Sequence, residues 1–175
     1  MAGIEYNPEL HKLYQDMGYD ANATGSNNIV AMLLSFLVGT ETKDINSNEY
    51  LTADVLASAK AYSDQAIVVL SNDVVESSDS SLEALKLTSN RQELIRTVAE
   101  NFEHVIIIVN VGNATELGIV DEYDSIEAVV WTGIPGTQGC ISLGKVLSGQ
   151  INPSGRLVDT YAYDVSSAPA SENFG

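Results

Sequence analysis

Two segments, VIIIVNVGN at 105–113 and AVVWTGIPG at 128–136, decide the fold of this 175-residue chain. Each is a short run of valine and isoleucine that ends abruptly at glycine. Such runs are typical of strands that are buried on both faces of a parallel sheet. A further turn follows at NPSG, residues 152–155. Because open α/β folds bind ligands at the carboxyl ends of their strands, the loops leaving these runs are the first place to look for function.

Outward from these segments, strand patterns and helix patterns alternate. The predicted elements are strands at 66–71, 105–110 and 128–133, a last strand or edge at 156–161, helices at 89–102 and 136–148, and a short helix or turn at 115–123. Ser89 is expected to cap the helix over 89–102, with Gln92 completing a capping box, and Gly149 to follow the last helix. This alternation predicts an α/β fold, a three-layer α/β/α sandwich with a mostly parallel sheet of about five or six strands.

The first 56 residues are harder to interpret. Asn7 and Pro8 predict the start of a helix that ends at Gly18, with an apolar face formed by Leu10, Leu13, Tyr14 and Met17. A second helix is predicted over 51–62. The apolar run 29–39 is shorter than the roughly 20 residues that span a bilayer, so we expect it to be a buried element.

Composition restricts the partners. There are 24 acidic residues against 8 basic ones, which gives a net charge of −16. This charge disfavours nucleic acid and anionic membranes, whereas a neutral ligand such as a sugar is indifferent to it. The single cysteine, Cys140, excludes an internal disulfide, and no secretory signal pattern opens the chain. We therefore expect a cytoplasmic protein.

The loop VVESSDSS at 74–81 contains Glu76, the candidate catalytic residue, and Asp79, a candidate for substrate binding. Glu76 and Asp79 follow the predicted strand 66–71, and carboxylates at such a strand end are well placed for acid/base chemistry. The alternative is a solvated acidic loop without a catalytic role. Trp131, at the end of another strand, either stacks on a sugar or belongs to the core.

No cofactor or metal is expected. The glycines of the WTGIPGTQG turn at 131–139 lack the spacing of a dinucleotide fingerprint and are first of all required by the turn itself. His11 and His104 have no partners at metal-ligand spacing in the sequence.

From about Ala57 to Gly175 the chain resembles the C-terminal α/β-sandwich domain of glycoside hydrolase family 3, the β-glucosidase family. The motifs that carry the resemblance are W-x-G-x-P-G-x-x-G at 131–139, N-P-S-G-R-L at 152–157, and the order E-S-S-D, L-K-L and Q-E-L-I at 76–79, 85–87 and 92–95. The resemblance implies that 1–175 is one domain of this type, without the family's catalytic β/α barrel.

The resemblance also implies a function. Glu76 falls on the family's general acid/base, although Val75 and Ser77 replace the flanking glycines and Ser80 replaces a frequent arginine. The parent enzyme would hydrolyse terminal β-linked glucose, or a related sugar, with retention. Retention also needs a carboxylate nucleophile about 5 Å away.

In family 3 the nucleophile is an aspartate of the barrel, in an S-D-W or S-D-Y motif, and neither tripeptide occurs here. We therefore expect the chain alone to be inactive. Its expected partners are a β-glucoside or related oligosaccharide and the missing barrel, and the surface left uncovered invites self-association. The alternative is a catalytically inert carbohydrate-binding or interaction module of flavodoxin-like architecture.

Overall fold

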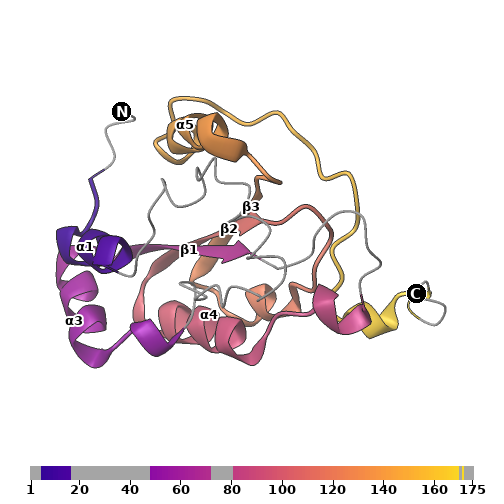
Figure 1. The fold of residues 1–175 in the computed structure, drawn as a ribbon, viewed down its shortest axis with the longest axis horizontal. Coiled ribbons are helices and arrows are strands. Elements are labelled where there is room, and N and C mark those ends of the chain that lie inside the picture. Colours follow the sequence, from indigo (N-terminus) through magenta and orange to yellow (C-terminus); the bar gives the residue numbers. More distant parts are fainter. Residues whose placement is uncertain (1–4, 17–47, 72–80, 170, 172–175) are drawn as a thin grey trace, which may run out of the picture.

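The computed structural model describes residues 5–16, 48–71, 81–169 and 171, and its centre is a parallel sheet (Figure 1). Its strands are β1 (Gln65–Ser71), β2 (His104–Asn110) and β3 (Ile126–Trp131), hydrogen-bonded in the order β1-β2-β3. Both strand pairs are parallel. The predicted α/β fold is therefore confirmed, but within the described ranges the sheet has three strands rather than five or six.

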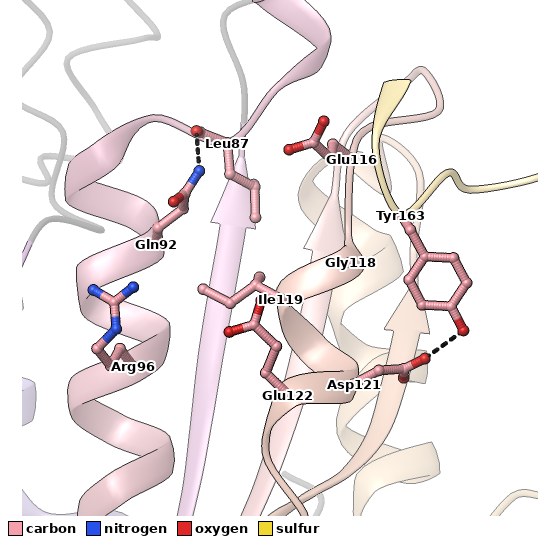
Figure 2. A pocket seen from close by; sticks show the side chains of 9 residues that line it. All are labelled: Leu87, Gln92, Arg96, Glu116, Gly118, Ile119, Asp121, Glu122 and Tyr163. Atoms are coloured by element: carbon pink, nitrogen blue, oxygen red, sulfur yellow. Dashed lines mark hydrogen bonds between the residues drawn. The ribbon is translucent and has the colours of Figure 1, made fainter. Parts of the chain in front are cut away.

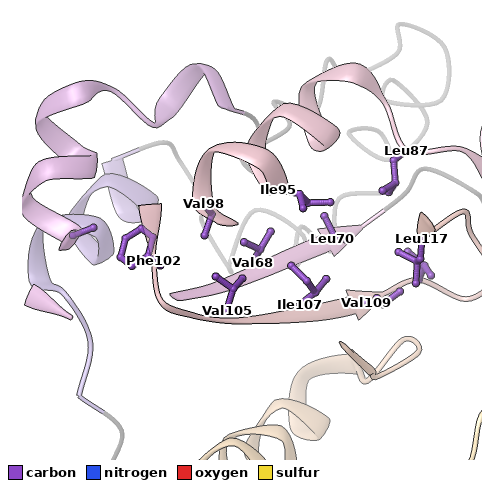
Figure 3. Close-up of a cluster of buried hydrophobic side chains, with 12 residues drawn as sticks. Val68, Leu70, Leu87, Ile95, Val98, Phe102, Val105, Ile107, Val109 and Leu117 are labelled. Carbon is purple, nitrogen blue, oxygen red and sulfur yellow. The ribbon is translucent and has the colours of Figure 1, made fainter. Parts of the chain in front are cut away.

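Helices lie on both sides of the sheet, as a three-layer sandwich requires. α4 (Ser89–Asn101) covers one face and α5 (Gly136–Leu147) lies on the other (Figures 1 and 3). α3 (Ala53–Tyr62) and α1 (Pro8–Asp16) contact each other beside the amino ends of the strands. The 3₁₀ turns are η2 (Asn48–Tyr50), η3 (Leu82–Leu85), η4 (Gly118–Glu122) and η5 (Val165–Ser167). No helix in the described ranges is long and apolar enough to cross a lipid bilayer.

The hydrophobic core lies between α4 and the sheet (Figure 3). Alternate residues of β1 and β2 point toward α4 because side chains alternate between the faces of a strand. These residues expose 4% or less of their surface: Val68, Leu70, Val105, Ile107 and Val109. Ile95 and Val98 of α4 pack against them. Since burying a side chain of this size contributes about 1.5–3 kcal/mol, this cluster is the main attachment of α4 to the sheet.

The face of the sheet toward α5 is less completely covered. Ile67 and Val69 of β1 expose 48% and 37% of their surface, whereas Ile108 of β2 is buried. The apolar run 29–39, which the sequence predicts to be a buried element, lies outside the described residues.

The start of α1 follows the predicted chemistry. Asn7 Oδ1 accepts hydrogen bonds from the backbone N–H groups of Glu9 and Leu10, at 2.9 and 3.1 Å. Pro8 is the first helical residue. Asn7 therefore satisfies two N–H groups that have no partner inside the helix. The predicted end at Gly18 lies outside the described residues.

The start of α4 differs from the prediction by one residue. Thr88, and not Ser89, is the N-cap, with its Oγ1 accepting from the backbone N–H of Arg91 at 3.4 Å. Gln92 does not complete a capping box. Its Nε2 instead donates to the carbonyl oxygen of Leu87 at 3.0 Å. Thr88 and Ser89 are both suitable caps, so composition alone cannot choose between them.

Residues 156–161 do not form the predicted strand or edge. Asp159 Oδ1 accepts from the backbone N–H of Thr160 at 2.7 Å, a local bond that competes with strand pairing. Just beyond, the carbonyl of Ala162 accepts from the N–H of Leu117 at 3.0 Å. The segment is thus tied to the start of η4 and makes no ladder with a described strand.

Candidate functional site

The carboxyl ends of the parallel strands are the rim where the sequence places its candidate catalytic residues. β1 ends at Ser71, and the loop that follows contains Glu76 and Asp79. Both residues lie in the stretch 72–80, outside the described residues. Their catalytic and substrate-binding roles therefore remain predictions.

Trp131, the last residue of β3, is held by a hydrogen bond and by apolar packing. Its indole Nε1 donates to the carbonyl oxygen of Val111 at 2.9 Å. The ring is partly buried and packs against the core. It also lines a hollow described below, so one part of the ring stabilises the fold while another borders a cavity.

The turn after β3 requires glycine at two positions. Gly133 and Gly136 have φ angles of +62° and +61°, in the left-handed region that side chains with a Cβ rarely adopt. Gly136 is also the first residue of α5. The predicted tight turn between strand and helix is present.

A polar hollow of about 460 Å³ opens between α4 and η4 (Figure 2). α4 contributes Gln92 and Arg96, and Leu87 and Ile119 provide apolar walls. The remaining polar groups come from the chain around η4 and from the C-terminal segment: Glu116, Asp121, Glu122 and Tyr163. We call this the polar hollow.

Hydrogen bonds fix several of these side chains. The Tyr163 hydroxyl donates to Asp121 Oδ2 at 2.6 Å. This bond raises the pKa of Tyr163 above that of a free phenol. Glu116 Oε2 accepts from the backbone N–H of Val165 at 3.0 Å. A hydrogen bond to Glu93, followed by one to Tyr123, raises the pKa of Arg96.

Beside it lies a second, mainly apolar hollow of about 240 Å³. Trp131, Tyr161 and Leu157 line it, and burial, followed by the charge of Asp159, raises the pKa of Tyr161. Asp121 and Tyr163 line both hollows. We call this second space the apolar hollow, and the two together the cleft.

Sequence reasoning did not identify this cleft. Arg96, Glu116, Asp121 and Tyr163 are far apart in the chain, and none of them was predicted to bind a ligand. The predicted substrate-binding residues were Asp79 and Trp131. Trp131 lines the cleft, and Asp79 lies outside the described residues. The sequence did not predict that the other residues lie together, because the fold brings their separate segments to one place.

A group of ionisable side chains lies at the opposite edge, at the amino ends of the strands. Ligand atoms of Asp64, Glu103 and His104 are within 4.8 Å of one another, which the sequence spacing did not indicate. His104 Nδ1 is 2.7 Å from Glu127 Oε1, and this bond raises the pKa of the imidazole. All four side chains are at least partly exposed, and the ring nitrogen already has a partner, so we assign no metal here.

A parallel sheet with helices on both faces defines an α/β-sandwich domain. In this one the cleft lies beside α4. Residues 17–174 match the family model described as the glycosyl hydrolase family 3 C-terminal domain. The chain therefore belongs to this domain family, as the motifs at 131–139 and 152–157 suggest.

Known relatives carry names consistent with this assignment. A β-glucosidase of Ruminococcus albus is 36% identical over 114 residues, which cover 64% of this chain and 12% of that protein. A β-glucosidase of Schizophyllum commune is 31% identical over 137 residues, covering 75% of this chain and 70% of that sequence. The solved β-glucosidase from Paenibacillus barengoltzii superposes with a TM-score of 0.63 at 30% identity, covering 71% of this chain and 14% of that one. The chain thus spans a small part of the Ruminococcus and Paenibacillus proteins.

Proposed function

We propose that this chain is the α/β-sandwich domain of a retaining β-glycosidase that hydrolyses terminal O-glycosidic bonds. The observation that carries the proposal is the family match over residues 17–174, together with relatives that are named β-glucosidases. The proposed substrate is a β-glucoside or a related oligosaccharide. A neutral substrate is compatible with the net charge of −16.

In this proposal Glu76 is the general acid/base. It follows β1, and loops at the carboxyl ends of parallel strands are where α/β folds bind ligands. A carboxylic acid there would protonate the leaving-group oxygen and then, as carboxylate, activate the water that attacks the glycosyl intermediate. Asp79 and Trp131 are proposed to contact the sugar.

The nucleophile is proposed to come from a β/α-barrel domain that packs against this one. The sequence contains no S-D-W or S-D-Y motif, so the chain supplies one of the two carboxylates that retention requires. Exposed apolar residues near the carboxyl rim support a missing partner. Ile134, in the turn after β3, exposes 75% of its surface, and Leu157 and Val158 are also exposed.

Activity measurements test whether the two carboxylates come from two different domains. The purified chain is expected to release no nitrophenol from p-nitrophenyl β-glucoside above background, because the second carboxylate is absent. Turnover that co-purifies with the chain through successive columns, and that Glu76→Gln abolishes, would contradict the two-domain proposal.

The role of Glu76 is tested in the full-length protein that contains this chain. Glu76→Gln should slow an alkyl β-glucoside about 10²-fold or more, and slow a dinitrophenyl glucoside much less, since a good leaving group needs little protonation. Glu100→Gln, which removes an exposed carboxylate from α4, is the matched control and should leave both rates unchanged. Equal slowing of both substrates by Glu76→Gln would exclude a general acid.

The alternative function is an inert carbohydrate-binding or interaction module. Val75 and Ser77, which stand where the family has glycines beside the acid/base, favour it because they restrict the loop around Glu76. A full-length protein whose glycosidase rate is unaffected by Glu76→Gln would support this alternative.

A further inference from the structure

The segment 152–161 runs along the outside of the molecule between two fixed points (Figure 1). Before it, the carbonyl oxygen of Lys145 accepts hydrogen bonds from the N–H groups of Gln150 and Ile151, at 2.9 and 3.2 Å. After it, the carbonyl of Ala162 accepts from the N–H of Leu117 at 3.0 Å. Within the described ranges, no hydrogen bond joins the backbone of 152–161 to the backbone elsewhere in the chain. The backbone groups of this segment are therefore open to pairing with another strand.

Two neighbouring apolar side chains of this segment are exposed. Leu157 and Val158 expose 59% and 85% of their surface. Neighbouring side chains of an extended chain point to opposite faces, so a single packing surface cannot cover both. A partner strand brings side chains to both faces at once and can cover them. Valine, threonine and tyrosine, which follow here as Val158, Thr160 and Tyr161, also favour strand pairing.

The sequence R-L-V-D at 156–159 is complementary to itself when two copies run antiparallel. A two-fold axis between Leu157 and Val158 places Arg156 opposite Asp159 of the partner subunit. It also places Leu157 opposite Val158 of the partner subunit. Because residues directly opposite each other project to the same face, each face of the pair carries one ion pair and one apolar pair.

Charge selects this register over its alternatives. Two chains of net charge −16 repel one another, so their contact needs opposite charges at close range. Arg156 is the single basic residue between Lys145 and the end of the sequence. A parallel in-register pairing would place arginine against arginine, and an antiparallel register shifted by one residue would place Leu157 against an aspartate.

We propose that two copies of this chain associate through residues 155–160, paired as antiparallel strands around the two-fold axis between Leu157 and Val158. The bends at Val158 and Asp159 straighten when the strands pair. The hydrogen bond from the N–H of Thr160 to Asp159 Oδ1 opens, so that this carboxylate is released for Arg156 of the partner subunit. An isolated pair of strands is only marginally stable in water, so the dimer is weak and reversible. The proposal is independent of the hydrolytic function proposed above.

Sedimentation of the purified chain over a concentration series, up to about 1 mM, tests the proposal. Arg156→Glu should weaken the dimer about tenfold or more, because the two-fold axis turns one substitution into two contacts between like charges. Asp159→Arg should weaken it similarly. The combined variant, Arg156→Glu with Asp159→Arg, restores opposite charges at both contacts and should recover the dimer of the original chain.

Lys145→Glu is the matched control, because it changes the net charge of the chain by the same amount at an exposed position outside the segment. It should leave the dimer nearly unchanged. Equal weakening by Lys145→Glu and Arg156→Glu, or no recovery in the combined variant, would overturn the proposed register. A chain that stays monomeric throughout the series would overturn the dimer itself. So would a longer, monomeric protein in which another domain protects the amides of 155–160 from hydrogen exchange.

Discussion

Gly118→Ala is the sharpest test of how the C-terminal segment is attached. Gly118 opens η4, directly under the backbone of Tyr163. A Cβ at this position would lie 2.4 Å from the Tyr163 carbonyl oxygen and 3.0 Å from its carbonyl carbon and Cα. All three atoms belong to the backbone, so no side-chain rotation can relieve the contact. The carbonyl would have to retreat by about 1 Å to reach the 3.4 Å of ordinary contact.

That retreat strains the hydrogen bonds on either side. The N–H of Leu117 donates to Ala162 at 3.0 Å, and the N–H of Val165 donates to Glu116 at 3.0 Å. Losing one such bond costs about 1 kcal/mol, and overpacking costs a further 1–3 kcal/mol or so. Alanine also lowers the conformational entropy of the unfolded chain, which stabilises the folded protein by about 0.4–1 kcal/mol. We therefore expect Gly118→Ala to lower the free energy of unfolding by about 2–3 kcal/mol.

Urea denaturation followed by tryptophan fluorescence measures this change. Trp131 is the single tryptophan of the chain and packs against the core, so it reports on unfolding. A chain of this size should also lose roughly 2–4 °C in Tm for each kcal/mol. Gly155→Ala is the matched control, because its Cβ would have no atom within 4 Å, and it should change stability by less than about 0.5 kcal/mol. If both variants were equally stable, the close approach at Gly118 would not be a feature of the folded protein.

Three further outcomes are expected. Thr88→Ala should lower the free energy of unfolding by about 1 kcal/mol, measured in urea, because the N–H of Arg91 loses its cap. Glu127 raises the pKa of His104 above its ordinary 6.5. The pair therefore stabilises the folded protein fully below about pH 6.5, and this stabilisation is lost as the pH rises through the folded-state pKa of His104. Glu127→Gln should reduce this dependence, because it removes the largest of the contributions that raise the pKa, and urea midpoints across about pH 5–9 would reveal the change. Finally, the chain should form a dimer or larger species in sedimentation experiments through its exposed apolar rim, and a strict monomer at high concentration would contradict this.

The strands could be predicted closely from the sequence, because buried parallel strands require uninterrupted valine and isoleucine. Two predictions differ: the strand or edge at 156–161 does not form, and the strand predicted at 128–133 is displaced from the observed β3, Ile126–Trp131. Glu127 breaks the apolar run, yet it belongs to the strand and pairs with His104 on the neighbouring one. At the other end, the positive φ of Gly133 turns the chain away before the apolar pattern stops.

The cleft could not be predicted, for a different reason. Gln92 and Asp121 are ordinary surface residue types on separate elements, and their proximity depends on how η4 packs beside α4. The catalytic prediction, in contrast to the cleft, depends on a sequence motif and not on the structure. Glu76 was identified by motif order within one loop, and because it lies outside the described residues its role still depends on that motif.

The strand order has a consequence for how the protein is made. Within the described ranges β2 pairs with β1 and β3 pairs with β2, so each added strand joins the strand that comes before it in the chain. On the ribosome, β1, α4 and β2 emerge as one continuous unit that already contains most of the buried core. β3 can then add to an existing edge, followed by the tyrosine-containing segment that completes the cleft. Chains fold as they are synthesised, and this topology lets the nascent chain bury β1 and β2 against α4 before β3 joins the sheet.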